Sequence, residues 1–187
     1  MSSDPEAAAV IRPARAEDAA GCLDIYAPIV RETPISFETQ VPSVEEFTRR
    51  IDGTMRNYPW LVCEYGGAVA AYAYACRHRK REAYRWSAEV SVYVADARLR
   101  HGFGRKIYSE LIQILTRQGY ANAYAGIALP NPASVAFHQS MGFEEVGVYA
   151  RVGFKLGRWH DVGWWALRLA DGSSQPAEPI PFSALAL

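Results

Sequence analysis

The sequence lacks an excess of charge of either sign. Its 187 residues contain 20 Lys and Arg against 20 Asp and Glu, so the formal net charge at pH 7 is zero. Affinity for a phosphate backbone needs a basic surface, and the neutral balance therefore argues against a dedicated nucleic-acid binder. No apolar run approaches the roughly 20 residues that cross a bilayer, so we expect no membrane contact. Residues 1–10 contain acids and no long apolar core, unlike a secretory signal.

Cysteine and histidine are also scarce. The three cysteines, Cys22, Cys63 and Cys76, lie in apolar stretches, and their spacing fits neither a zinc site nor a redox pair. We therefore expect reduced, buried thiols and a cytoplasmic location. The four histidines form no His-Glu-x-x-His pair, so the sequence predicts no metal site.

The order of apolar patterns predicts one domain over residues 11–170, between a flexible tail at 1–10 and a C-terminal tail at 171–187. Period-two patterns indicate strands, and patterns with helical spacing indicate helices between them. This order predicts a mixed α/β fold, a twisted sheet with helices on both faces. The expected strands are 11–13, 60–65, 68–76, 86–95, 121–129, 143–149 and 162–169, and the expected helices are 17–31, one opening at Ser43, one after Gly104 that Gly119 ends, and 133–141.

The turn after residues 92–94 is the most informative stretch. A strand is followed by a turn with Gly102 and Gly104, and a helical pattern begins there. The first amides of a helix lack internal partners and carry a partial positive charge, so such a turn can seat a phosphate. Arg100 and Arg105 add formal positive charge. A dinucleotide fingerprint would need a third glycine where Ile107 stands, and no Gly-Lys-Ser/Thr of a P-loop occurs.

Glu89 is the candidate general base. Strand residues alternate between faces, so Glu89, Ser91 and Tyr93 share one face and the valines at 90, 92 and 94 share the other. If the valines face the core, Glu89 points toward the opposite face, where a carboxylate could accept a proton from a reacting amine. The alternative is a solvent-facing strand residue. No Gly-x-Ser-x-Gly turn supplies a nucleophile, so we expect no acyl-enzyme.

The residues at 99–104 resemble the coenzyme-binding loop of the GNAT N-acetyltransferase superfamily, whose pattern is (Gln/Arg)-x-x-Gly-x-(Gly/Ala); Leu99 departs at its first position. A second family signature, an Asn before a helix that ends in Gly-Phe, corresponds to Asn131 and to residues 142–143. The stretches 83–89, 130–138 and above all 157–163, with Trp-His-Asp-Val-Gly, are similar to phosphinothricin N-acetyltransferases, as is nearly the whole chain from 11 to 169. Relatives act on phosphinothricin, methionine sulfoximine or methionine sulfone.

The resemblance implies a mostly antiparallel sheet, acetyl-CoA as co-substrate, a small acidic amino-acid analogue as acceptor, and a homodimer. It implies that Glu89 and His138 form an acid/base pair. The coenzyme site it implies comprises Val92, Tyr93, Val94, Arg100, His101, Gly102, Phe103, Gly104, Arg105, Asn131 and Ser134. The substrate site it implies comprises Phe37, Arg79, Arg81, Tyr84, Tyr93 and Val162. Arginine suits anionic head groups because it offers paired donors.

Two other functions stay open at this point. One keeps the enzyme class and changes the acceptor to a polyamine, an aminoglycoside or a peptide N-terminus. The other is an acyl-CoA-binding module without turnover. The basic run at 77–81 lies beside Glu89 in the sequence and favours an acidic acceptor over a cationic one.

Overall fold

The computed structural model describes residues 8–170 and 176–186. Seven strands form one sheet in the order β1-β2-β3-β4-β5-β7-β6. Within these described residues every neighbouring pair is antiparallel except β4 and β5, which run parallel. The strands are β1 Val10–Pro13, β2 Trp60–Tyr65, β3 Ala68–Arg77, β4 Ser87–Val94, β5 Asn122–Leu129, β6 Glu144–Lys155 and β7 Arg158–Arg168.

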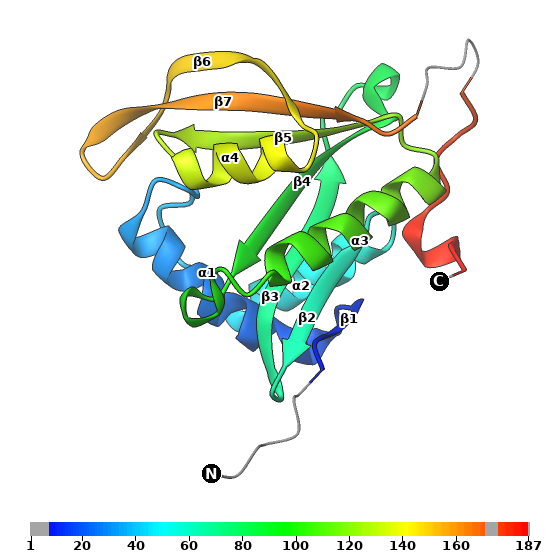
Figure 1. Cartoon of the computed structure of the whole chain (residues 1–187), viewed down its shortest axis with the longest axis horizontal. Coiled ribbons are helices and arrows are strands. Elements are labelled where there is room, and N and C mark those ends of the chain that lie inside the picture. The colour runs from blue at the N-terminus through cyan, green and yellow to red at the C-terminus, as the bar shows by residue number, and fades with distance from the viewer. Residues whose placement is uncertain (1–7, 171–175, 187) are drawn as a thin grey trace.

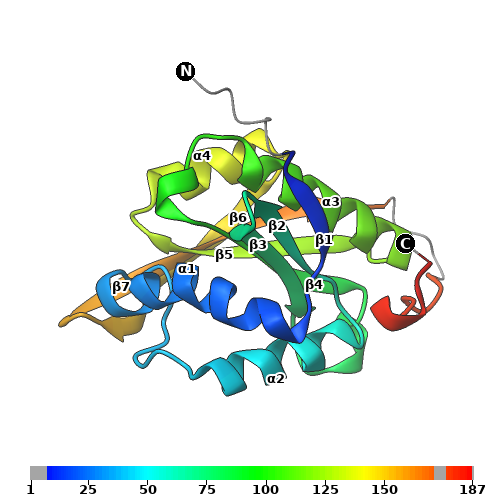
Figure 2. The same ribbon diagram turned by 90° about the horizontal axis from the view of Figure 1, so that it is seen from below.

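Helices cover both faces of the sheet, which confirms the predicted mixed α/β architecture. The helices are α1 Ala19–Glu32, α2 Val44–Met55, α3 Phe103–Gln118 and α4 Pro132–Ser140. Figure 2 shows α3 and α4 on one side of the sheet and α1 and α2 on the other. Because β4 and β5 lie in the middle of the strand order and helices cover both faces, these two strands are at the centre of the molecule (Figure 1).

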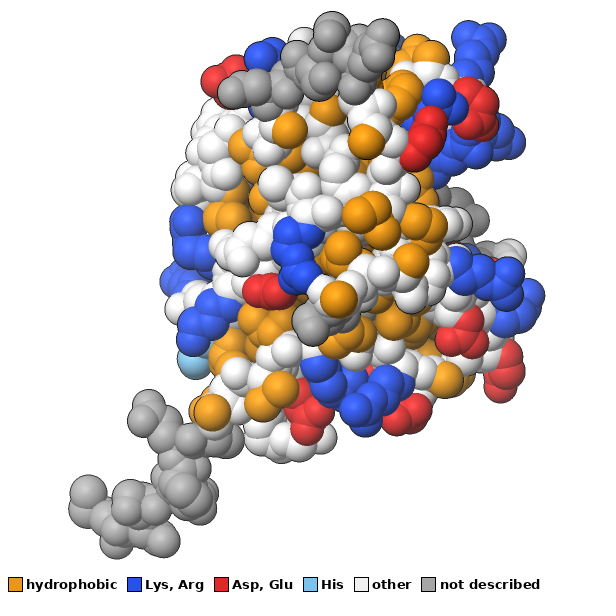
Figure 3. Space-filling view, turned by 90° about the vertical axis from the view of Figure 1, so that its right-hand side faces the viewer, with side chains coloured by type: hydrophobic (Ala, Val, Ile, Leu, Met, Phe, Trp, Pro, Cys, Tyr) orange, Lys and Arg blue, Asp and Glu red, His pale blue; other side chains and the backbone are white. Residues whose placement is uncertain are grey.

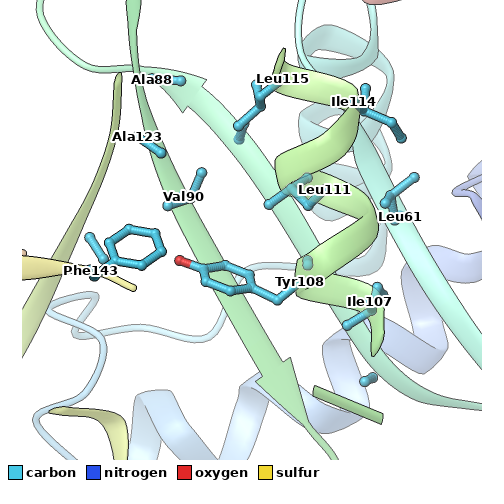
Figure 4. Close-up of a cluster of buried hydrophobic side chains, with 14 of the residues drawn as sticks. Leu61, Ala88, Val90, Ile107, Tyr108, Leu111, Ile114, Leu115, Ala123 and Phe143 are labelled. Atoms are coloured by element: carbon cyan, nitrogen blue, oxygen red, sulfur yellow. The ribbon is translucent and has the colours of Figure 1, made fainter. Parts of the chain in front are cut away.

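The core under α3 combines many small residues on the sheet with large residues on the helix. Alanines at positions 71, 73, 75, 88 and 123 are all buried in it, so the helix approaches the strands closely. Figure 4 shows the side chains that α3 presents to this core, among them Ile107, Tyr108, Leu111 and Leu115. Burial of each such side chain contributes about 1.5–3 kcal/mol to folding.

The opposite core, under α1 and α2, is aromatic. Trp60 stacks on Tyr72 with ring centroids 5.8 Å apart, and Phe47 meets Trp60 edge to face at 5.6 Å. Tyr93 of β4 packs against Tyr26 of α1 at 5.4 Å and against Tyr72 at 5.0 Å. The face of β4 that carries Tyr93 and Glu89 is therefore the one that α1 and α2 cover, opposite to the valine face, as strand alternation predicts.

Helix boundaries follow local sequence signals. The Ser43 side chain accepts a hydrogen bond from the Glu46 amide at 3.2 Å and starts α2. Gly102 before α3 has φ of 80° and Gly119 after it has φ of 90°, a left-handed conformation that glycine adopts without steric cost. These two glycines fix where α3 begins and ends.

The hairpin of β6 and β7 is longer than the sequence predicts. Its strands reach Lys155 and Arg158, whereas the pattern placed only residues 143–149 and 162–169 in strands. The reason is a break in register between Tyr149 and Gly153, which shifts the alternation of side chains and hides the pairing from a period-two reading.

The C-terminal segment 176–186 packs on the body of the protein, although its sequence shows little pattern. The buried Gln118 side chain donates hydrogen bonds to the carbonyl of Asn57 at 2.8 Å and to that of Ile180 at 2.7 Å. The Trp86 indole donates to the carbonyl of Ala177 at 2.7 Å. Phe182 inserts into the α3 core and is only 5% exposed.

One face of the molecule shows how the charges are distributed. On the side of the molecule in Figure 3, where the C-terminal segment lies, acidic and basic side chains are interspersed with apolar ones.

None of the described helices is long and apolar enough to cross a membrane. Over residues 8–170 and 176–186, no group of three or more metal-ligating side chains comes together.

We predict that Phe182→Ala lowers the free energy of unfolding by about 3 kcal/mol, because it leaves a cavity in the core. Ile180→Ala is the matched control, since the Ile180 side chain is 45% exposed and its backbone bonds to Gln118 are retained. Urea unfolding followed by circular dichroism measures both. Equal, small losses for the two variants would show that the segment does not stabilise the fold.

Candidate active site

The site forms where β4 and β5 separate. The two parallel strands pair only between Ser87–Glu89 and Asn122–Tyr124, a span of three residue pairs. Beyond Glu89, β4 continues along β3 and β5 continues along β7, so each strand keeps one partner and turns its other edge to the gap. Three adjoining cavities of about 610, 60 and 440 Å³ fill this gap and its two mouths.

The largest of these cavities, the coenzyme groove, lies against the start of α3. Its walls come from the end of β4, the turn at 96–105, the end of α1 and the first turns of α4. Of the coenzyme residues implied by the resemblance, the groove is lined by Val92, Tyr93, Val94, Arg100, Gly102, Phe103, Gly104, Arg105, Asn131 and Ser134, together with His138.

His101 is the exception among those residues. Its side chain is exposed and lies outside the lining, with Nδ1 2.9 Å from the carbonyl oxygen of Leu99 and the ring stacked on Phe103. The structure does not bring this side chain to the groove.

The start of α3 has the properties of an anion seat. Its first internal hydrogen bond runs from the Lys106 amide to the Gly102 carbonyl at 3.1 Å, so the amides of residues 103–105 have no partner within the helix. The positive helix terminus adds attraction for negative charge. A Cβ atom at Gly104 would lie 3.1 Å from Val94, so the glycine keeps β4 and the helix start close together.

Asn131 and Arg105 support the groove through contacts with α4. The Asn131 side chain accepts a hydrogen bond from the Ser134 amide at 3.1 Å and so starts that helix. Arg105 donates to the hydroxyl of Ser140 at 2.7 Å. Both side chains line the groove while they fix α4 beside α3.

The cavity of about 440 Å³, the acceptor cavity, lies on the other side of the gap. Glu89 and Arg79 lie in its wall, and the remaining wall is mostly apolar. The full lining is Ile35, Phe37, Arg79, Glu89, Val90, Ser91, Gly126, Ala128, Tyr149, Val152, Val162 and Trp164.

Glu89 is a half-buried carboxylate with two hydrogen-bonding neighbours. Its Oε1 accepts from Nη1 of Arg79 at 3.1 Å and lies 3.0 Å from Nδ1 of His78. Burial raises the pKa of Glu89 above its ordinary value, and the charge and hydrogen bond of Arg79 oppose that rise. A carboxylate with a raised pKa is a stronger base for a proton at neutral pH than a fully exposed one.

The structure brings together only part of the implied substrate site. Phe37, Arg79 and Val162 line the acceptor cavity. Tyr93 lines the groove and the small cavity of about 60 Å³ beside it, and its ring packs in the aromatic core. Arg81 and Tyr84 are exposed on the loop before β4 and do not line the acceptor cavity.

The junction is the narrow cavity of about 60 Å³ that joins the acceptor cavity to the groove. His138 lies in its wall. Nδ1 of His138 is 2.8 Å from the carbonyl oxygen of Ser134, and Nε2 is 3.1 Å from the hydroxyl of Tyr108. A carbonyl can only accept, so Nδ1 carries the proton and Nε2 accepts from the tyrosine.

Burial lowers the pKa of His138, and the hydrogen bond to Ser134 only partly offsets this, so the ring is neutral at pH 7. Both ring nitrogens are engaged by the protein. Proton donation by His138 to a departing thiolate would therefore require the ring to exchange one of these hydrogen bonds.

Several lining or neighbouring residues had no place in the sequence-based site, among them Ile35, Trp164 and His78. Ile35 reaches all three cavities from the loop after α1, and Trp164 covers the acceptor cavity from β7. His78 follows β3, whose residue Cys76 pairs with Glu89. Residues two apart share a face and diagonal pairs lie close, so the strand register was the signal that could have placed His78 beside Glu89.

Comparison with known proteins agrees with this geometry. Residues 11–164 match the Acetyltransferase (GNAT) domain family. A phosphinothricin N-acetyltransferase of Streptomyces viridochromogenes is 38% identical over 155 residues, which cover 83% of this chain and 85% of that protein. An L-methionine sulfoximine/L-methionine sulfone acetyltransferase of Pseudomonas aeruginosa is 35% identical over 170 residues, or 90% of this chain and 99% of that protein.

A solved structure shows the same fold with coenzyme bound. The phosphinothricin acetyltransferase of Sinorhizobium meliloti in complex with acetyl-CoA superposes with a TM-score of 0.86 at 34% identity, covering 92% of this chain and 95% of that one. The chain therefore belongs to the GNAT acetyltransferase family and is an N-acetyltransferase. Within that family it is similar to the phosphinothricin and methionine sulfoximine acetyltransferases.

We predict that Gly102→Ala weakens coenzyme A binding about tenfold, because a side chain at positive φ costs about 1–2 kcal/mol and shifts the first amides of α3. Gly66→Ala is the matched control, since Gly66 also has positive φ, of 60°, but lies in the turn between β2 and β3. Isothermal titration calorimetry gives both dissociation constants. Unchanged affinity in the Gly102 variant would remove this turn from the coenzyme site.

Proposed function

We propose that the protein transfers the acetyl group of acetyl-CoA to the amino group of a small amino-acid analogue of the phosphinothricin, methionine sulfoximine or methionine sulfone type. The observation that supports this proposal most strongly is the path that leads from the coenzyme groove through the junction to the acceptor cavity. Glu89 lies in the wall of the acceptor cavity. The relatives named above act on such analogues, as their names say. The unpaired cysteines support the accompanying proposal of a cytoplasmic location.

In this proposal acetyl-CoA binds with its diphosphate at the amides of residues 103–105. Its thioester then enters the junction along the edge of β4 that faces the gap. A backbone amide in residues 92–94 would polarise the thioester carbonyl, since a fixed donor stabilises the oxygen that becomes negative in the transition state. The residues that hold the coenzyme are those of the groove, with Arg100 and Arg105 adding positive charge near the diphosphate.

Glu89 accepts the proton that the acceptor ammonium must lose before attack. The neutral amine then attacks the thioester carbon directly in the ternary complex and forms the carbon–nitrogen bond. The carbon–sulfur bond breaks, the attacking nitrogen loses its surplus proton, and the departing thiolate gains one, so that coenzyme A leaves as the thiol. His138 lies beside this path and is the candidate donor to the sulfur, subject to the exchange of hydrogen bonds described above.

The acceptor cavity suits a compact amino acid. Arg79 lies beside Glu89 and over the ring of Trp164, with its guanidinium carbon 5.4 Å from the ring centroid, and it offers donors to a carboxylate. Phe37, Val152 and Val162 form an apolar wall for the rest of the acceptor. Arg81 and Tyr84 stay in the proposal as residues of the neighbouring loop that a bound acceptor could reach only after the loop moves.

We also propose a homodimer. The β6–β7 hairpin exposes a group of large apolar side chains that a second copy would bury. Exposed fractions of about half or more are found at Val146, Tyr149, Val152, Phe154, Leu156 and Trp159. Tyr149 and Val152 also line the acceptor cavity, so the partner would lie close to the acceptor.

Glu89→Gln is predicted to retain acetyl-CoA binding and to lower kcat by about 10² or more, because the amide cannot accept the ammonium proton. In the parent protein kcat/KM should fall as the pH decreases through the raised pKa of Glu89, since the protonated carboxyl is no base. Glu82→Gln, an exposed change in the loop before β4, is the control. Thiol release measures turnover, and wild-type rates in the Glu89 variant would exclude this base.

An acceptor panel tests the substrate class. We expect thiol release with methionine sulfone, methionine sulfoximine and phosphinothricin, and at least tenfold lower kcat/KM with a polyamine, because Arg79 repels a second positive charge. Turnover of cationic acceptors alone would replace the acceptor class with the polyamine or aminoglycoside alternative. Coenzyme binding without thiol release from any amine would favour the non-catalytic module.

A further inference from the structure

His78 is a histidine beside Glu89 that the mechanism above does not use. Its side chain is only 12% exposed, and its Nδ1 lies 3.0 Å from Oε1 of Glu89. We propose that His78 is a positioning residue, which holds the Glu89 carboxylate in the orientation from which it takes the proton of the acceptor. This inference rests on the proposed role of Glu89 as the base.

The hydrogen-bond roles follow from the groups present. An ionised carboxylate can only accept a hydrogen bond, so Nδ1 of His78 must carry the ring proton and donate the hydrogen bond to Glu89. Burial, with a smaller contribution from the charge of Arg79, lowers the pKa of His78, so the ring is neutral at pH 7. His78 therefore orients the carboxylate as a neutral donor and does not compete with Arg79 as a second cation.

The His78 ring is itself held in place from several sides. It stacks on Tyr124 of β5 with centroids 4.5 Å apart and planes 15° apart. Trp164 of β7 and Tyr84 of the loop each meet it edge to face at 6.0 Å. A donor on a ring packed by β5 and β7 has little freedom to follow the carboxylate, so the carboxylate must conform to the donor.

Both donors to Glu89 bind the same oxygen. Arg79 and His78 meet Oε1, and among the described residues no hydrogen bond ends on Oε2. Oε1 is thereby anchored, and Oε2 is the atom left to accept the ammonium proton. The titratable groups beside Glu89 are His78 and Arg79 from the loop after β3, Cys76 from β3 and Tyr124 from β5, whose backbone pairs with that of Glu89. Burial keeps the Cys76 thiol protonated by raising its pKa to about 12.

The test compares two substitutions of His78. His78→Phe retains a flat ring for the stack on Tyr124 and removes the donor. It is expected to lower kcat about tenfold at pH 7 with little change in the KM for acetyl-CoA, and to move the acidic limb of the kcat/KM profile to higher pH, because loss of a donor raises the pKa of the carboxylate. His78→Asn places an amide donor near the position of Nδ1 and should restore part of both effects.

A double variant separates positioning from a general structural role. If His78 acts through Glu89, adding His78→Phe to Glu89→Gln should change kcat by less than about twofold. A full further tenfold loss in that background would overturn the inference, as would wild-type kcat and an unmoved acidic limb in His78→Phe. If Glu89→Gln alone retains full turnover, the base assignment fails and the His78 inference fails with it. If Glu89→Gln loses turnover and His78→Phe does not, the His78 inference alone fails.

Discussion

The site depends on one constraint in the sheet, which is that β4 and β5 pair at their start and then part. Three residue pairs join them, and each strand then follows its other neighbour. A flat, fully paired sheet would offer no cavity at its centre. The separation instead exposes two backbone edges, places the start of α3 at one mouth of the gap and leaves Glu89 at the last paired position, beside the other mouth. In the proposed function, coenzyme and acceptor therefore meet from opposite sides of the gap.

The electrostatics of the gap follow from this geometry. At the coenzyme mouth the positive charge comes from backbone amides and from arginines at the turn, which suits a diphosphate. At the acceptor mouth a single carboxylate is half-buried between Arg79 and His78. Burial alone would push Glu89 toward its protonated form, and the charge and hydrogen bond of Arg79 oppose this rise in its pKa. Tyr108 and Ser134 similarly hold the neutral ring of His138 in one tautomer at the junction.

Much of the fold followed from sequence because its signals are local. Glycines 102 and 119 mark the ends of α3, and strand alternation placed Glu89 opposite the valine face. The β6–β7 hairpin was underestimated because its bulge breaks the alternation on which the prediction relied. The packing of Phe182 was not predictable, because a short segment with three prolines has no periodicity and its partner is a core built from distant residues. In the site, the turn at 102–105 was found from a motif. Ile35 and His78 belong to no such motif, and only the tertiary structure brings them beside the other site residues.

The most direct test of this account is a crystal structure of the protein with coenzyme A. We predict that diphosphate oxygens lie within hydrogen-bond distance of the amides of residues 103–105, with the pantetheine arm between β4 and β5 and the sulfur beside His138. A coenzyme bound elsewhere, with this gap closed by protein side chains, would contradict the central claim that the parting of the two strands creates the active site.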